Sequence, residues 1–76
     1  MLKWEGESVG SLAWLRFHRK GDYPVVVGRV DADHMFYIWP GNGRLGEAVF
    51  PWPEGMEMGD ELKRYVEAQW HLLDKP

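Results

Sequence analysis

The sequence predicts a small α+β domain, in which an antiparallel β-meander of three or four strands has one C-terminal α-helix packed on one face. Three observations carry this prediction. Residues 24–30 (PVVVGRV) contain three consecutive valines, residues 35–39 (MFYIW) form a second apolar run, and apolar residues recur at helical spacing from Asp60 onward. Short strands joined by tight turns pair antiparallel, and an amphipathic helix then covers one face. The 76 residues suffice for a single domain, 1–76.

The first two strands have short or mixed patterns. Leu2 and Trp4 fit a short first strand that turn-forming residues end. Residues 11–20 (SLAWLRFHRK) fit either a strand, with Trp14 on the face of the charged side chains, or a helix ending at Gly21. We favour the strand, because Gly21-Asp22 leads directly into the valine-rich segment.

The clearest strand spans residues 24–30, since β-branched side chains favour a pleated surface. Gly28 in its interior predicts a bulge or the close approach of a large neighbour such as a tryptophan. Asp31-Ala32-Asp33-His34 reads as a four-residue turn with Asx-type hydrogen bonds. Residues 35–39 form the return strand, which is apolar on both faces, so we expect the helix to cover one and leave the other partly open.

Turn formers and prolines dominate the segment that follows. Asn42-Gly43 within Pro40–Gly43 suits a type I′ hairpin. A further strand is expected over residues 44–50. Pro51 and Pro53 then give an extended, polyproline-like path that should hold Trp52 out of the sheet.

The helix is predicted from Asp60 onward, in the segment DELKRYVEAQWHLL. Asp60 is a suitable N-cap, and Asp60 with Glu61 complements the positive end of the helix dipole. The residues expected to face the sheet are Leu62, Tyr65, Val66, Trp70 and Leu73. Trp70 and Trp4 are therefore assigned to the core.

Composition restricts the class of protein. Residues 1–46 carry six Lys/Arg and five Asp/Glu, whereas residues 47–76 carry three and seven, for a net charge of −3. A general nucleic-acid binder is usually more basic, so the balance favours a protein partner. The absence of cysteine excludes disulfides and thiolate metal sites and favours a reducing cytoplasm. Apolar runs are too short to cross a bilayer, and no signal peptide is evident, so no membrane association is expected.

No motif predicts catalysis, a cofactor or a metal. Residues 41–46 (GNGRLG) match the dinucleotide fingerprint, but Pro51 leaves no room for the helix that it requires. Asp31, Asp33 and His34 supply possible metal ligands, but an Asx turn explains them better. Serines are found only at positions 8 and 11, no threonine is present, and no motif places a base beside them, so we expect no enzyme.

Five tryptophans in so short a chain exceed what its core should need, which predicts a binding surface. Trp39 and Trp52 each precede a proline near the end of an element, where a ring is often exposed. The principal hypothesis is a non-enzymatic inhibitor or adaptor, of a kind found in phage and bacterial genomes, that docks a tryptophan-centred patch on a larger protein. The predicted partner-binding residues are Trp39, Trp52, Tyr37, Arg44 and Phe50.

Two alternatives remain at this point. The first is a single-stranded nucleic-acid binder that uses a basic and aromatic hairpin made of Trp14, Arg16, Phe17, Arg19 and Lys20. The second is a homodimer in which the open face of residues 35–39 is buried against its copy. Salt dependence separates the first from protein binding, because phosphate contacts weaken steeply with ionic strength.

Overall fold

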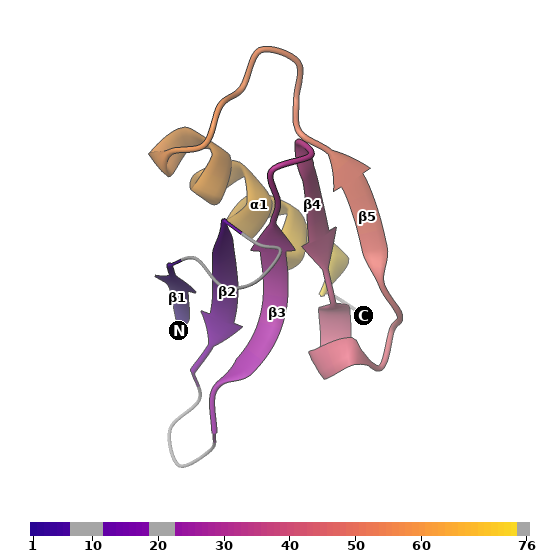
Figure 1. Cartoon of the computed structure of the whole chain (residues 1–76). Helices are drawn as coiled ribbons and strands as arrows, with labels where there is room; N and C mark the ends of the chain where they lie inside the picture. The colour runs from indigo at the N-terminus through magenta and orange to yellow at the C-terminus, as the bar shows by residue number, and fades with distance from the viewer. Residues whose placement is uncertain (7–11, 19–22, 75–76) are drawn as a thin grey trace.

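A computed structural model of the chain describes residues 1–6, 12–18 and 23–74. Its β-strands are β1 (Leu2–Glu5), β2 (Ala13–Phe17), β3 (Val25–Val30), β4 (Met35–Ile38) and β5 (Ala48–Pro51). A 3-10 helix, η1 (Pro40–Gly43), connects β4 to β5, and the α-helix α1 (Asp60–Leu73) comes last. The strands form one antiparallel sheet in the order β1-β2-β3-β4-β5 (Figure 1). The predicted α+β meander is confirmed, with five strands instead of three or four.

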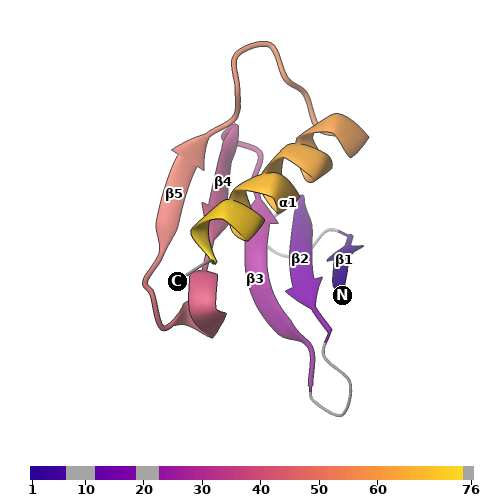
Figure 2. The ribbon, with the colours of Figure 1, turned by 180° about the vertical axis from the view of Figure 1, so that it is seen from behind.

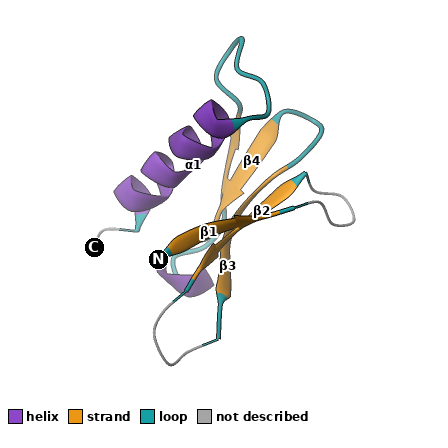
Figure 3. Ribbon diagram, turned by 90° about the vertical axis from the view of Figure 1, so that its left-hand side faces the viewer, coloured by secondary structure: helices purple, strands orange, loops and turns teal. Residues whose placement is uncertain are grey.

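The helix crosses one face of the sheet, as the view from behind shows (Figure 2). In the side view, α1 lies on one side of the strands and forms a second layer (Figure 3). It contacts β3 and β4 through its buried residues Leu62, Val66 and Trp70. We call the helix side the covered face and the other side the open face.

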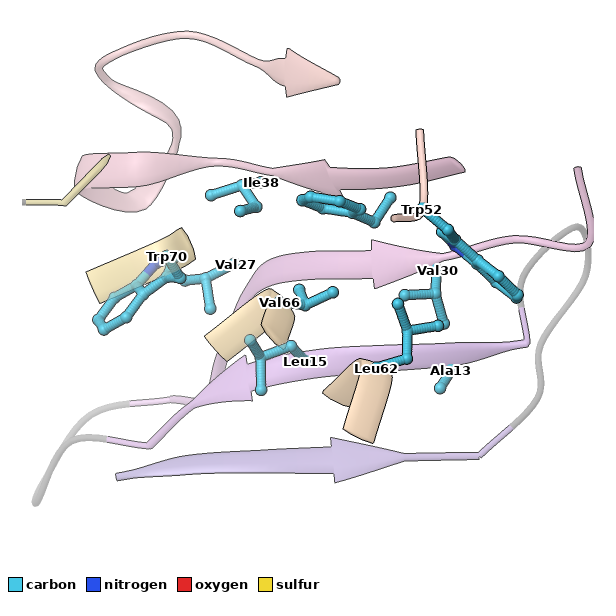
Figure 4. Close-up of a cluster of buried hydrophobic side chains, with 10 residues drawn as sticks. Ala13, Leu15, Val27, Val30, Ile38, Trp52, Leu62, Val66 and Trp70 are labelled. Atoms are coloured by element: carbon cyan, nitrogen blue, oxygen red, sulfur yellow. The ribbon is translucent and has the colours of Figure 1, made fainter. Parts of the chain in front are cut away.

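The core fills the space between α1 and the covered face (Figure 4). Side chains from the middle of the sheet are completely enclosed there, because alternate residues of a strand point to opposite faces. The fully enclosed strand residues are Leu15, Val27, Val30, Phe36 and Ile38. Trp4 packs against this core from the edge, and its indole Nε1 donates to Glu67 Oε1 at 3.0 Å.

A bulge interrupts the pairing of β2 with β3 between Leu15 and Arg16. Its position beside Gly28 confirms the first of the two expectations for that glycine. The close approach comes from β4 and not from a tryptophan: a Cβ on Gly28 would lie 3.2 Å from the carbonyl oxygen of Tyr37. Gly28 therefore allows β3 and β4 to pack closely at the centre of the sheet.

Three local predictions were wrong or shifted. Pro40–Gly43 forms a 3-10 turn, with Gly41 in the left-handed region at φ 60°, and not a type I′ hairpin. The strand expected over residues 44–50 begins only at Ala48. The N-cap of α1 is Gly59, so Asp60 is the first helical residue and makes no side-chain cap. By contrast, the Asx turn is confirmed, because Asp31 Oδ1 accepts from the N–H groups of Asp33 and Met35 at 3.0 and 3.2 Å.

Candidate binding surface

The open face carries a row of side chains that crosses the three central strands. Strand pairing sets Trp14 on β2 opposite Arg29 on β3, and Arg29 opposite Tyr37 on β4. Their sequence neighbours, such as Leu15, Val30 and Phe36, point into the core, so these three point away from it. Trp39 continues the same alternation, and its backbone N–H donates to the carbonyl oxygen of Val27 at 3.0 Å. We call Trp14, Arg29, Tyr37 and Trp39 the open-face cluster.

The members of the open-face cluster pack on one another. The guanidinium carbon of Arg29 lies 3.9 Å from the ring centroid of Tyr37 and 5.9 Å from that of Trp14. The Tyr37 and Trp39 rings are nearly parallel, 13° apart in plane and 6.2 Å between centroids. Cation–π and stacking contacts of this kind each contribute about 0.5–1.5 kcal/mol. The cluster is therefore ordered before any partner arrives.

All four cluster side chains are half-buried, although no described element covers this face of the sheet. The rings and the guanidinium shield one another laterally and leave their outer edges exposed. Val49, opposite Tyr37 on β5, extends the surface and is 43% exposed. The result is an apolar strip with one cation at its centre.

Charged side chains of β1 and β2 lie beside the open-face cluster. Lys3 and Arg16 are opposite each other on β1 and β2, on the same face as Trp14. Glu5 Oε2 accepts from Arg16 Nε at 2.6 Å, an ion pair that is largely open to solvent. With Arg29, the described strands place three basic side chains and one acidic side chain on this face. Residues 54–74, on the helix side, hold six acidic and two basic residues.

The predicted partner-binding residues do not form one site. Tyr37 and Trp39 share the open face as expected. Trp52 is only 8% exposed, so the expectation that its prolines hold it out is wrong. Its Nε1 donates to the carbonyl oxygen of Met35 at 3.0 Å, and its ring meets that of His34 edge-on. Phe50 points to the covered face, where it packs on Phe36 with centroids 5.3 Å apart.

Arg44 lies away from the cluster, beside the end of the helix. It lines a shallow cavity of about 380 Å³ together with Phe17, Gly41, Leu45, Trp70 and Asp74. Asp74 closes one wall, because its Oδ1 accepts from the Gly41 N–H at 2.7 Å. This contact joins η1 to α1, so the cavity results from the packing of these two elements.

The residues predicted to bind nucleic acid do not all lie on the same face either. Trp14 and Arg16 lie on the open face, but Phe17 faces the helix and stacks on Trp70 at 5.5 Å. Arg19 and Lys20 lie outside the described residues.

Arg29 was missed by the sequence reasoning. A lone arginine between two buried neighbours in a valine strand must point outward, and that alternation is the signal that could have found it.

No family model, no curated protein and no solved structure was found to match this chain. Among residues 1–6, 12–18 and 23–74, no group of three or more His, Asp and Glu side chains could hold a metal ion. No helix in the same part of the chain is long and apolar enough to span a membrane. Function must therefore be argued from the open face itself.

Proposed function

We propose that this chain is a non-enzymatic binding domain that docks a larger protein on its open face. The observation that carries the proposal is the prepacked open-face cluster. Trp, Tyr and Arg are the residue types that dominate binding energy at protein interfaces, and here they adjoin on a face that no described element covers.

Order within the cluster supports tight binding. Association costs about 0.5–1.5 kcal/mol for each flexible side chain that it immobilises. Arg29 is already held against Tyr37, and Tyr37 against Trp39, so much of this cost is met on folding. A rigid aromatic strip bordered by polar groups matches the core-and-rim organisation of a protein interface.

An inhibitor or adaptor of phage or bacterial type fits a small domain that presents one face of its sheet to a partner. The lack of cysteine suits the reducing cytoplasm as its location. Identifying the partner tests both the inhibitor or adaptor role and the cytoplasmic location.

The test is capture of a partner from lysate of the source organism by tagged protein, after nuclease treatment and a high-salt wash. Tyr37→Ala should lose the protein that wild type retains, with the loss corresponding to about 2 kcal/mol or more. Tyr23→Ala is the matched control, because Tyr23 is 91% exposed and lies outside the cluster. Equal recovery by Tyr37→Ala and wild type would refute the proposal.

Single-stranded nucleic acid is a second candidate, favoured by the excess of basic side chains on the open face. Lys3, Arg16 and Arg29 accompany the rings there, and aromatic rings with nearby cations bind single strands. Fluorescence anisotropy with labelled oligo(dT) in low salt tests this directly. Binding that weakens steeply with salt and is lost in Trp14→Ala would replace the protein partner with a nucleic acid.

A further inference from the structure

β1 is one edge of the sheet, and two of its residues direct their backbone groups outward. Met1 and His18 exchange both hydrogen bonds, at 2.7 and 2.8 Å, one position beyond the Leu2–Phe17 pair. Antiparallel pairs alternate between those that exchange hydrogen bonds and those that do not. The N–H and C=O groups of Leu2 and Trp4 therefore point away from β2. No described strand lies on that side of β1, which is the edge of the sheet (Figure 1).

The charges of β1 alternate in sign around Trp4. Lys3 lies opposite Arg16, and Glu5 Oε2 forms an ion pair with Arg16 Nε at 2.6 Å. Within the described residues, no carboxylate lies within ion-pair distance of Lys3. Lys3 is thus an exposed cation beside a second cation, with no paired carboxylate among residues 1–6, 12–18 and 23–74.

We propose that β1 pairs antiparallel with β1 of a second copy of this chain, with Trp4 opposite the partner's Trp4. This register sets Lys3 opposite the partner's Glu5 at two symmetric positions. It also sets Leu2 opposite the partner's Gly6, so the outward groups of Leu2 and Trp4 all find partners. Two five-stranded sheets become one continuous sheet with a twofold axis.

The charge pattern selects this register over its neighbour. Centring the pair on Lys3 would oppose two lysines, and like charges directly across strands are destabilising. An edge lysine by itself discourages pairing, but in this register each Lys3 meets a Glu5 of opposite charge. The Trp4 rings would adjoin on the helix side, where Glu67 already holds each indole.

Other surfaces suit a second copy less well. The opposite edge, β5, ends in Pro51, which has no N–H to donate. Burying the open face against itself would bring Arg16, Arg29 and Lys3 toward the same residues of the copy. This inference goes beyond the proposed function, since it leaves the open-face cluster exposed on the joined sheet.

Sedimentation velocity over a concentration series tests the proposal. A single edge contact falls in the weak class below about 1,200 Å², so the series must reach roughly 1 mM. Wild type should rise from 8.9 kDa toward twice that mass. Leu2→Ala should still associate, whereas Leu2→Pro should stay monomeric, because proline removes an outward donor that the monomer does not use.

A charge swap makes the test specific for the register. Lys3→Glu should weaken association roughly tenfold, and adding Glu5→Lys should restore it, because both cross-strand pairs again join opposite charges. Arg64→Glu makes the same charge change on the exposed side of the helix and should leave association unaffected. Circular dichroism of each variant checks that it is folded.

Three results would overturn the proposal. The first is wild-type protein that stays at 8.9 kDa throughout the series. The second is association of Leu2→Pro that equals that of Leu2→Ala. The third is loss of association in Tyr37→Ala with retention in Leu2→Pro, which would move self-association to the open face.

Discussion

Trp39 and Trp52 each precede a proline just beyond a strand, yet one lies on the open face and the other is buried in the core. Trp39 follows Tyr37, which points outward, by two residues. Trp52 follows Phe50, which points inward, by two residues. The strand period of two continues through the last residues before each proline. The Trp-Pro pair does not decide where an indole lies. The indole's position in that alternation decides whether it lies on the open face or in the core.

The two faces of the sheet therefore use similar side chains for different purposes. On the covered face, Phe36, Trp52 and Trp70 exclude water and supply folding energy. On the open face, Trp14, Tyr37 and Trp39 pack laterally around a guanidinium and keep their outer edges exposed. Substitutions on the two faces should accordingly separate stability from binding.

The largest expected effect is that of Trp52→Ala. Removing a buried indole together with its hydrogen bond to the Met35 carbonyl oxygen should lower the free energy of unfolding by about 3–5 kcal/mol. Urea denaturation at 25 °C measures this change. Trp39→Ala, a half-exposed ring beside the same kind of proline, should cost clearly less. Equal losses in the two variants would contradict the assignment of Trp52 to the core.

Gly28→Ala should come next, because it disturbs both faces at once. The new methyl group would meet the Tyr37 carbonyl oxygen at 3.2 Å and Leu15 Cβ at 3.4 Å. Since neither backbone nor core can move freely, we expect a loss of about 1–3 kcal/mol in the same urea assay. Gly6→Ala controls for the general cost of replacing a glycine, since nothing lies within 4 Å of its added Cβ and its φ is not in the left-handed region. A Gly28→Ala variant as stable toward urea as wild type would show that the spacing of β3 and β4 is not tight.

The Arg16–Glu5 pair should contribute least. Its side chains are 32% and 48% exposed, so solvent and salt screen their attraction. A double-mutant cycle with Arg16→Ala and Glu5→Ala should give a coupling of about 0.2–1 kcal/mol that falls as salt is added. A coupling that is larger and insensitive to salt would mean that the open face excludes water around this pair.

The fold could be predicted from the sequence because the signals for its strands, turn and helix are local. Three valines, a return strand, a turn with Asx chemistry and a helix with apolar residues at 3.6-residue spacing each depend on near neighbours. The first strand and the strand within residues 11–20 were also recognised as strands. The turn at Pro40–Gly43 was placed correctly but its type was wrong, since Asn42-Gly43 is compatible with several turn types.

The candidate site was only partly predictable, because face assignment needs strand pairing. Residues 35–39 are apolar on both faces, so the pattern could not tell which face the helix covers. Trp52 was misplaced for another reason: Pro51 and Pro53 predicted a path out of the sheet, and Phe50 was assigned to the site beside it. Arg29 joins the cluster through its pairing with Trp14 and Tyr37, which a single sequence does not reveal.

The most direct test of the account compares Trp39→Ala with Trp52→Ala in two assays, partner capture from lysate and urea denaturation. The account predicts that Trp39→Ala stays nearly as stable as wild type but loses the partner. It predicts that Trp52→Ala is strongly destabilised yet still captures the partner under conditions where circular dichroism shows it folded. Capture of the partner by Trp39→Ala at the wild-type level would contradict the assignment of binding to the open face.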